Sequence, residues 1–172
     1  MSVISQKICL IGDFNVGKTS LVRRFIEDKF SDRYLTTIGV KVSRKSVLVK
    51  SSQQVNLLVW DIEGHTKLKS IPTTYLQGAR GAIIVGDLTR NETLQHLPNH
   101  LKLFSQINPQ GKTIVALNKS DLISAEKLNK LVELYNFNRY EQVLDTYTTS
   151  AKTGQYVNTI FDELAAAIVE KM

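Results

Sequence analysis

The chain has 172 residues, of which 42% are hydrophobic and 22% charged, with a formal net charge of +6 and a single cysteine. This length suits one domain with a substantial core, covering residues 1–172, and one cysteine excludes a disulfide framework. No apolar run approaches the ~18 residues of a membrane-spanning helix, and the N-terminus lacks a charged-then-apolar signal, so we expect a cytoplasmic protein. We also expect it to be a monomer.

Apolar runs alternate with helical periods along the chain, which is the pattern of βα units around a largely parallel sheet. A strand at 8–11 leads through a glycine-containing loop into a helix that ends near residue 28. Two extended runs, 40–50 and 55–62, are separated by only four polar residues, so they must pair antiparallel. The remaining strands are predicted at 81–87, 112–117 and 143–148.

Apolar residues at helical spacing link these strands. The three stripes are Leu94, Leu97, Leu101 and Phe104; Leu128, Leu131, Val132 and Tyr135; and Val157, Ile160, Phe161, Leu164 and Ile168. We therefore predict an α/β fold with a six-stranded, mostly parallel sheet, one antiparallel edge strand, and about five helices on both faces.

The loop Gly12-Asp13-Phe14-Asn15-Val16-Gly17-Lys18-Thr19 follows a strand and precedes a helix, which indicates a P-loop. Its backbone N–H groups can point at a phosphate, and the positive end of the helix dipole adds to their field. Lys18 would reach the β- and γ-phosphates, and the Thr19 hydroxyl would bind Mg²⁺. The predicted phosphate-binding residues are Asn15, Val16, Gly17, Lys18, Thr19 and Ser20.

Two later segments point to guanine as the base. In Asn118-Lys119-Ser120-Asp121, the Asp121 carboxylate can accept two parallel hydrogen bonds from guanine N1–H and N2–H₂, an edge that adenine does not offer. In Thr149-Ser150-Ala151-Lys152, the Ala151 N–H can donate to the guanine carbonyl. Lys119 and Lys152 would lay their stems along the two faces of the base. Each segment alone is a weak signal, but together and in order with the P-loop they are strong.

At this point the chain resembles the Ras superfamily of small GTPases, and most closely its Rab branch, over nearly its whole length. Beyond the three segments above, 36–40 (Thr-Thr-Ile-Gly-Val) is similar to the first switch and 60–65 (Trp-Asp-Ile-Glu-Gly-His) to the second. The segment 75–79 resembles the one that ends the second-switch helix in Rabs. The resemblance implies a small G domain that binds GTP or GDP with Mg²⁺ and meets effector and exchange-factor proteins at its switches.

The resemblance also implies roles for single residues. Thr37 would bind Mg²⁺ and sense the γ-phosphate, Asp61 would hold Mg²⁺ through water, and the Gly64 N–H would contact the γ-phosphate. Phe30 would pack against guanine, and Tyr34 would cover the phosphates. In Rabs two aromatics matching Trp60 and Tyr75 form an effector patch with a phenylalanine, but here the third position is Val42, so no partner carries over from the family.

Three departures from the family pattern lie near the expected γ-phosphate, at Phe14, Glu63 and His65. His65 replaces the glutamine that orients the attacking water, and Phe14 would crowd the route of an external arginine, which is worth about 10³–10⁵ in rate. The Glu63 carboxylate would add negative charge near the γ-phosphate. We expect His65, Gly64 and Lys18 to be the catalytic residues and hydrolysis to be slow.

Three functions are compatible with these residues. The first is a slow, Mg²⁺-dependent GTP/GDP switch. The second is a GTP-binding interaction module with negligible turnover, and the third is another P-loop enzyme such as an ATPase or nucleoside kinase. The guanine argument speaks against the third.

Two further expectations concern histidines and surfaces. His96 and His100 stand four residues apart on a predicted helix without a third metal ligand, so we expect two exposed residues. Residues 1–50 hold ten Lys or Arg against four Asp or Glu, which suits an acidic partner, an anionic membrane or a plain solvated face, whereas no nucleic-acid-reading motif is present. Rabs carry C-terminal prenylated cysteines, but this chain ends at Met172, so membrane attachment would need a longer C-terminus or a partner.

Overall fold

The computed structural model describes residues 3–33, 35–67 and 69–170. Its sheet has the strand order β2-β3-β1-β4-β5-β6. The strands are β1 (Ile4–Gly12), β2 (Val40–Val49), β3 (Gln53–Ile62), β4 (Gly81–Asp87), β5 (Lys112–Asn118) and β6 (Val143–Thr148). β2 pairs antiparallel with β3, and the other neighbours pair parallel. The predicted sheet, with its one antiparallel edge strand, is confirmed.

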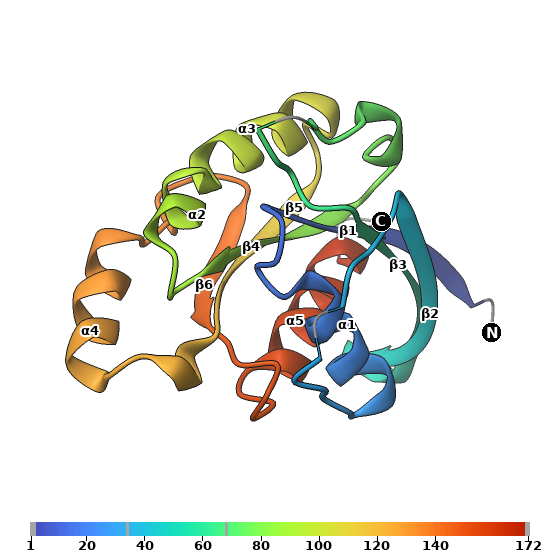
Figure 1. Ribbon diagram of the computed structural model, residues 1–172. Helices are drawn as coiled ribbons and strands as arrows, with labels where there is room; N and C mark the ends of the chain where they lie inside the picture. Colours follow the sequence, from blue (N-terminus) through green and yellow to red (C-terminus); the bar gives the residue numbers. More distant parts are fainter. Residues whose placement is uncertain (1–2, 34, 68, 171–172) are drawn as a thin grey trace.

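Helices cover both faces of this sheet (Figure 1). They are α1 (Lys18–Glu27), α2 (Asn91–Gln95), α3 (Leu97–Ile107), α4 (Ala125–Leu134) and α5 (Val157–Val169), with 3₁₀ turns at Lys50–Ser52, Thr73–Tyr75 and Ser120–Leu122. The stripe from Leu94 to Phe104, predicted as one helix, is divided between α2 and α3 at His96. Pro98 lies in the first turn of α3, where its missing N–H leaves no helical hydrogen bond unmade.

The second switch differs from the expectation. A helix ending at 75–79 was implied, but the described part of this region holds only the 3₁₀ turn Thr73–Tyr75. Pro72 precedes that turn in an extended conformation and cannot donate to a helical ladder. Thr73 and Thr74 are β-branched, which further lowers the helix propensity of the segment.

Strand side chains alternate between two apolar cores, one on each face of the sheet. Ile8 and Leu10 of β1 face the core beneath α1 and α5, whereas Cys9 and Ile11 face the core beneath α2 and α3. Cys9 is fully buried, as predicted. Because β1 and β3–β6 run parallel, their carboxyl ends meet at one edge of the sheet, where ligands bind in α/β folds.

The ring stack between α1 and α5 is a central contact of the first core. Phe25 and Phe161 stack with centroids 4.0 Å apart, and Phe161 is fully buried. We expect Phe161→Ala to lower the free energy of unfolding by about 3–5 kcal/mol, because it removes the ring and leaves a cavity. Urea denaturation measures the change, with Leu134→Ala on the exposed face of α4 as the control. A loss no larger than the control's would contradict the central role of the stack.

Candidate functional site

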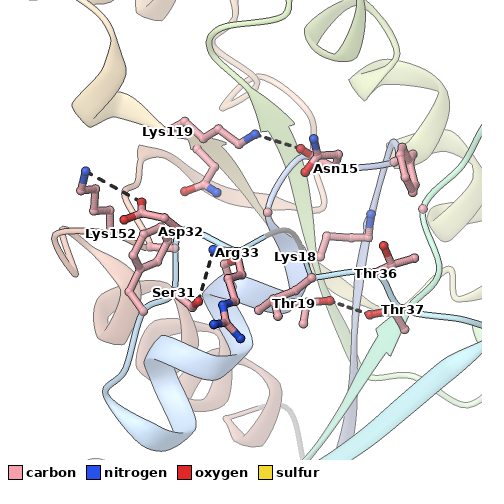
Figure 2. Close-up of a pocket in the computed structure, with 18 of the residues that line it drawn as sticks. Asn15, Lys18, Thr19, Ser31, Asp32, Arg33, Thr36, Thr37, Lys119 and Lys152 are labelled. Carbon is pink, nitrogen blue, oxygen red and sulfur yellow. Dashed lines mark hydrogen bonds and ion pairs between the residues drawn. The ribbon is translucent and has the colours of Figure 1, made fainter.

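A cavity of about 330 Å³ opens at the carboxyl edge of the sheet, between the P-loop, the first switch and the loops after β5 and β6. Figure 2 shows Lys119 and Lys152 toward one end of it, and Lys18, Thr19 and Thr37 toward the other. Predicted site residues that line it are Asn15, Gly17, Lys18, Thr19, Ser20, Phe30, Thr37, Gly64, Asn118, Lys119, Asp121, Ala151 and Lys152. Segments more than 100 residues apart in the chain thus share one cavity. Tyr34 lies outside the described residues.

The P-loop owes its shape to two left-handed residues. Asn15 has φ 63° and Gly17 has φ 100°, a region that asparagine tolerates and glycine adopts without strain. A Cβ at Gly17 would lie 2.3 Å from the Asn118 side-chain nitrogen. That amide donates to the Val16 carbonyl at 3.0 Å, so Val16 contributes backbone rather than cavity lining. The close approach of Asn118 therefore depends on glycine at position 17.

Lys18 lies buried beneath the loop, with its ammonium group bonded to the carbonyls of Gly12 at 3.1 Å and Asp13 at 2.8 Å. Burial lowers the pKa of Lys18 to about 8, against the opposing effect of the Asp61 and Asp13 carboxylates. A buried ammonium held by two neutral carbonyls is under-compensated. An anion in the cavity would supply the missing negative charge.

Oxygen atoms of Thr19, Thr37 and Asp61 converge beside Lys18. The two hydroxyls lie 2.6 Å apart, and the Asp61 Oδ2 accepts from Thr19 at 2.6 Å and from Thr37 at 3.2 Å. The other oxygen of Asp61 is buried and has no hydrogen-bond partner among the described residues. Burial raises the pKa of this carboxyl, and the Thr19 hydrogen bond and Lys18 oppose that shift. Hard oxygen donors with an unsatisfied carboxylate fit a small divalent cation such as Mg²⁺.

At the opposite end, the Asn118–Asp121 segment and the 149–152 segment are bonded to each other. Ser150 Oγ donates to Asp121 Oδ1 at 2.7 Å, and Thr149 Oγ1 donates to Asn118 Oδ1 at 3.1 Å. Lys119, in the left-handed region at φ 65°, donates to the Asn15 carbonyl at 3.0 Å. Asp121 thus lines the same end of the cavity as Lys119 and Lys152, and Lys152 lies 4.0 Å from the Asp32 carboxylate. A carboxylate between two lysine stems suits a flat base with donors on one edge.

Comparison with known proteins decides the family. The Ras family model matches residues 7–170. The chain belongs to the Ras family. It is 34% identical over 172 residues to the Ras-related protein SEC4 of Saccharomyces cerevisiae, a match covering 97% of this chain and 76% of SEC4. It is also 34% identical to the Ras-related protein Rab-13 of Bos taurus, over 96% of this chain and 80% of the relative. The Rab-13 of Canis lupus familiaris is 35% identical over the same shares.

As a Rab-like small GTPase, the chain presents its second switch against the P-loop. His65 N–H donates to the Gly12 carbonyl at 3.1 Å, and Phe14 N–H donates to the His65 carbonyl at 3.0 Å. A Cβ at Gly64 would lie 2.4 Å from Phe14 Cα, so only glycine permits this contact. Burial and then the neighbouring His100 lower the pKa of His65, with Asp13 opposing, which favours the neutral imidazole.

The expectation for Glu63 is corrected by the structure. Its carboxylate accepts the Gly39 N–H at 3.0 Å and pairs with Lys69 at 2.7 Å. The Lys69 hydrogen bond and then the Gly39 N–H lower the pKa of Glu63. The side chain therefore joins the end of the first switch of this Ras family member to its second switch, because a backbone donor and a cation lie within reach there. Its negative charge is therefore compensated by Lys69 and the Gly39 N–H.

The expectation for His96 and His100 was also wrong. His100 is buried, and both imidazoles hydrogen bond to the Asp13 carboxylate. Within the described residues no group of three or more His, Cys, Asp or Glu side chains could hold a metal ion. The spacing of the two histidines indicated that both side chains lie on one side of a helix. No neighbouring residue in the sequence indicated that this side faces the P-loop.

Two further residues near the P-loop were missed. Arg90 donates to the Phe14 carbonyl at 2.7 Å and to Asp87 at 3.1 Å. Asp87, fully buried at the end of β4, also pairs with Lys119 at 2.8 Å. The sequence did offer one sign that Asp87 could belong to the site, namely its position at the carboxyl end of a predicted strand. Part of the basic excess is likewise structural, because Arg24 donates to the carbonyls of Ala151 and Lys152 rather than only to solvent.

Val42, Trp60 and Tyr75 stand at the positions that the sequence analysis matched to an effector patch. Val42 pairs with Trp60 across β2 and β3 and is 50% exposed. The Lys7 ammonium lies 3.7 Å from the centre of the Trp60 ring and partly covers it.

Among the described residues, no helix is both long and apolar enough to cross a membrane.

Proposed function

We propose that this chain is a Mg²⁺-dependent GTP/GDP switch that hydrolyses GTP slowly. The observation that carries the proposal is the convergence of three separated motifs on one cavity, with a buried lysine at one end and a carboxylate flanked by lysines at the other. In this proposal Asp121 accepts from guanine, the Ala151 N–H donates to its carbonyl, and Lys119, Lys152 and Phe30 contact the ring. Ser150 positions Asp121 through its hydroxyl.

The phosphate end uses the P-loop from Asn15 to Ser20, with Lys18 balancing phosphate charge. Thr19, Thr37 and Asp61 would hold Mg²⁺, which neutralises charge on the β- and γ-phosphate oxygens when bound. Membership of the Ras family and the unsatisfied Asp61 oxygen both support this assignment. Tyr34 is proposed to cover the phosphates, by resemblance alone.

For the chemical step we propose that Gly64 contacts the γ-phosphate through its N–H and that His65 orients the attacking water. A neutral imidazole can accept a hydrogen bond from water, and partial burial lowers the pKa of His65, which favours that form. Its reach is restricted, since its backbone is bonded on both sides to the P-loop. A slow rate is expected because histidine stands at position 65 in place of a glutamine, and because the exposed Phe14 side chain, which lines the cavity, would crowd the approach to the γ-phosphate.

Affinities for GTP, GDP and ATP, measured with and without Mg²⁺, test the binding half of this proposal. Single-turnover phosphate release from preloaded GTP tests the hydrolytic half. Tight, Mg²⁺-dependent guanine nucleotide binding with slow release of phosphate is the expected pattern. Equal affinity for ATP would overturn the base site, and a rate equal to that of a glutamine-bearing family member would overturn slow hydrolysis.

The hydrolysis deficit is expected to come from several positions acting together. His65→Gln alone should raise the single-turnover rate by no more than about threefold, because the glutamine meets the same Phe14 ring. Adding Phe14→Gly and Glu63→Ala should exceed the product of the single effects, since residues around one reacting centre are not additive. Glu63→Ala would act by removing the contact between the two switches rather than by removing a negative charge from the γ-phosphate. Full recovery from His65→Gln alone would defeat this account.

A GTP-binding module with negligible turnover is the second candidate. Arg90 and Phe14 favour it, because Arg90 donates to the Phe14 carbonyl and the exposed Phe14 side chain lines the cavity, so together they would crowd an external arginine. Phosphate release within error of the uncatalysed control, at unchanged GTP affinity, would select this function.

We further infer that the chain acts in the cytoplasm as a monomer through proteins that bind its switches. Ile38 is 86% exposed and lies beside Thr37, so an effector that contacts it would sense the same segment as the γ-phosphate. Exchange-factor proteins are proposed at the same surface.

A further inference from the structure

All three histidines of the chain gather around one carboxylate of the P-loop. Asp13, 8% exposed, accepts from His96 Nδ1 through Oδ2 at 2.5 Å and from His100 Nε2 through Oδ1 at 2.7 Å. The His65 ring lies 5.6 Å from that of His100 and 6.3 Å from that of His96, centroid to centroid. The cluster therefore joins the P-loop, the second switch and α3.

The chemistry of Asp13 settles which histidine nitrogens carry protons. Burial acts to raise the pKa of its carboxyl, but hydrogen bonds from His100 and His96 outweigh it and hold the pKa below its usual range. An ionised carboxylate only accepts hydrogen bonds, so His96 must carry a proton on Nδ1 and His100 on Nε2. Both side-chain oxygens of Asp13 are thereby engaged, one by His100 of α3 and the other by His96, which directly precedes α3.

The backbone next to this carboxylate carries the contacts that matter for the γ-phosphate. The Asp13 carbonyl accepts from Lys18 at 2.8 Å. Its neighbours Gly12 and Phe14 make the two backbone hydrogen bonds to His65. A shift of Asp13 would therefore move two things together: the carbonyl that accepts from Lys18, and the backbone of Gly12 and Phe14 that hydrogen bonds to His65.

We propose that Asp13, His96 and His100 are positioning residues that attach the P-loop to α3 and so set where His65 lies relative to the γ-phosphate. For its effect on rate, the proposal rests on the proposed role of His65 in hydrolysis. The attachment of α3 to the sheet does not depend on the cluster, because Leu97, Leu101 and Phe104 already pack into the core. Misplacing a catalytic group by about 1 Å can cost about 10²-fold in rate, so a small shift suffices.

The test uses two double variants and one control. His96→Asn/His100→Gln replaces each imidazole N–H that faces Asp13 with an uncharged amide N–H donor. His96→Ala/His100→Leu removes both donors while filling most of the buried His100 site. Lys102→Ala, exposed on α3, is the matched control. Asp13→Asn provides a second disruption should the donor-free variant not fold, because it replaces one acceptor oxygen with a donor that meets a histidine N–H.

Single-turnover phosphate release and GDP affinity are measured for each. The donor-free variant is expected to lose about tenfold or more in rate with GDP affinity within about threefold, and the amide variant to recover most of the loss. Wild-type rate in the donor-free variant, or rate and GDP affinity falling by the same factor, would overturn the positioning role.

Imidazole ¹⁵N NMR separates this proposal from the hydrolysis proposal, and three histidines make the spectrum assignable. We expect a proton on His96 Nδ1 and on His100 Nε2, the nitrogens that face Asp13, and a His65 signal that moves in the donor-free variant and returns in the amide variant. If the wild type releases no phosphate, the hydrolysis proposal fails and this NMR series decides the positioning role alone. An unmoved His65 signal overturns it.

Discussion

Asp121→Asn is expected to exchange the base preference of the cavity from guanine to xanthine. The amide can donate to the xanthine C2 carbonyl, whereas guanine N2–H₂ would face a donor instead of a carboxylate oxygen. Charge-assisted hydrogen bonds contribute about 1.5–3 kcal/mol each, so losing the bidentate pair should weaken GTP binding by about 100-fold or more. Calorimetric titration of GTP and xanthosine triphosphate gives the ratio.

The local geometry makes this a clean substitution. Ser150 Oγ donates to Asp121 Oδ1, and asparagine keeps an oxygen able to accept that bond. Asp32→Asn, in the same cavity wall, is the matched control and should leave the ratio of the two affinities unchanged. Retention of wild-type GTP affinity by Asp121→Asn would mean that the base does not lie against residue 121.

Lys18→Ala is expected to weaken GDP and GTP together by about 100-fold or more. The ammonium is the buried cation at the phosphate end of the cavity, and its loss leaves phosphate charge uncompensated in a partly desolvated site. Nucleotide affinities by fluorescence competition measure the effect, with Lys130→Ala on exposed α4 as the control. An affinity loss no larger than that of Lys130→Ala would remove Lys18 from the phosphate site.

Thr37→Ala is the partner experiment at the same end of the cavity. It should leave GDP affinity within about threefold of wild type and weaken GTP affinity by about tenfold. The reason is that the Thr37 hydroxyl is proposed to contribute to binding only when a γ-phosphate is present. The contact between the Thr37 and Thr19 hydroxyls shows that position 37 reaches the proposed metal site. If both nucleotides weakened alike, Thr37 would be a structural residue rather than a γ-phosphate sensor.

The sequence by itself determined the order of strands and helices, the P-loop and the family. These features depend on local periodicity and on motifs whose spacing is short, so each can be interpreted without knowing what lies next to it in space. The antiparallel β2–β3 pair is an example, because a short connection permits no other arrangement. Asn118 is another, since its place after a strand already puts it at the ligand-binding edge.

Only the tertiary structure decided which partners several charged and polar side chains contact. Glu63 turns to Gly39 and Lys69, Arg24 to the 151–152 carbonyls, and His96 and His100 to a carboxylate 83 and 87 residues earlier in the chain. The parallel pairing of β1 with β4 brings the P-loop beside the helices that follow β4. Hydrogen bonds between such distant segments depend on strand adjacency and side-chain reach, and neither leaves a periodic trace in the sequence.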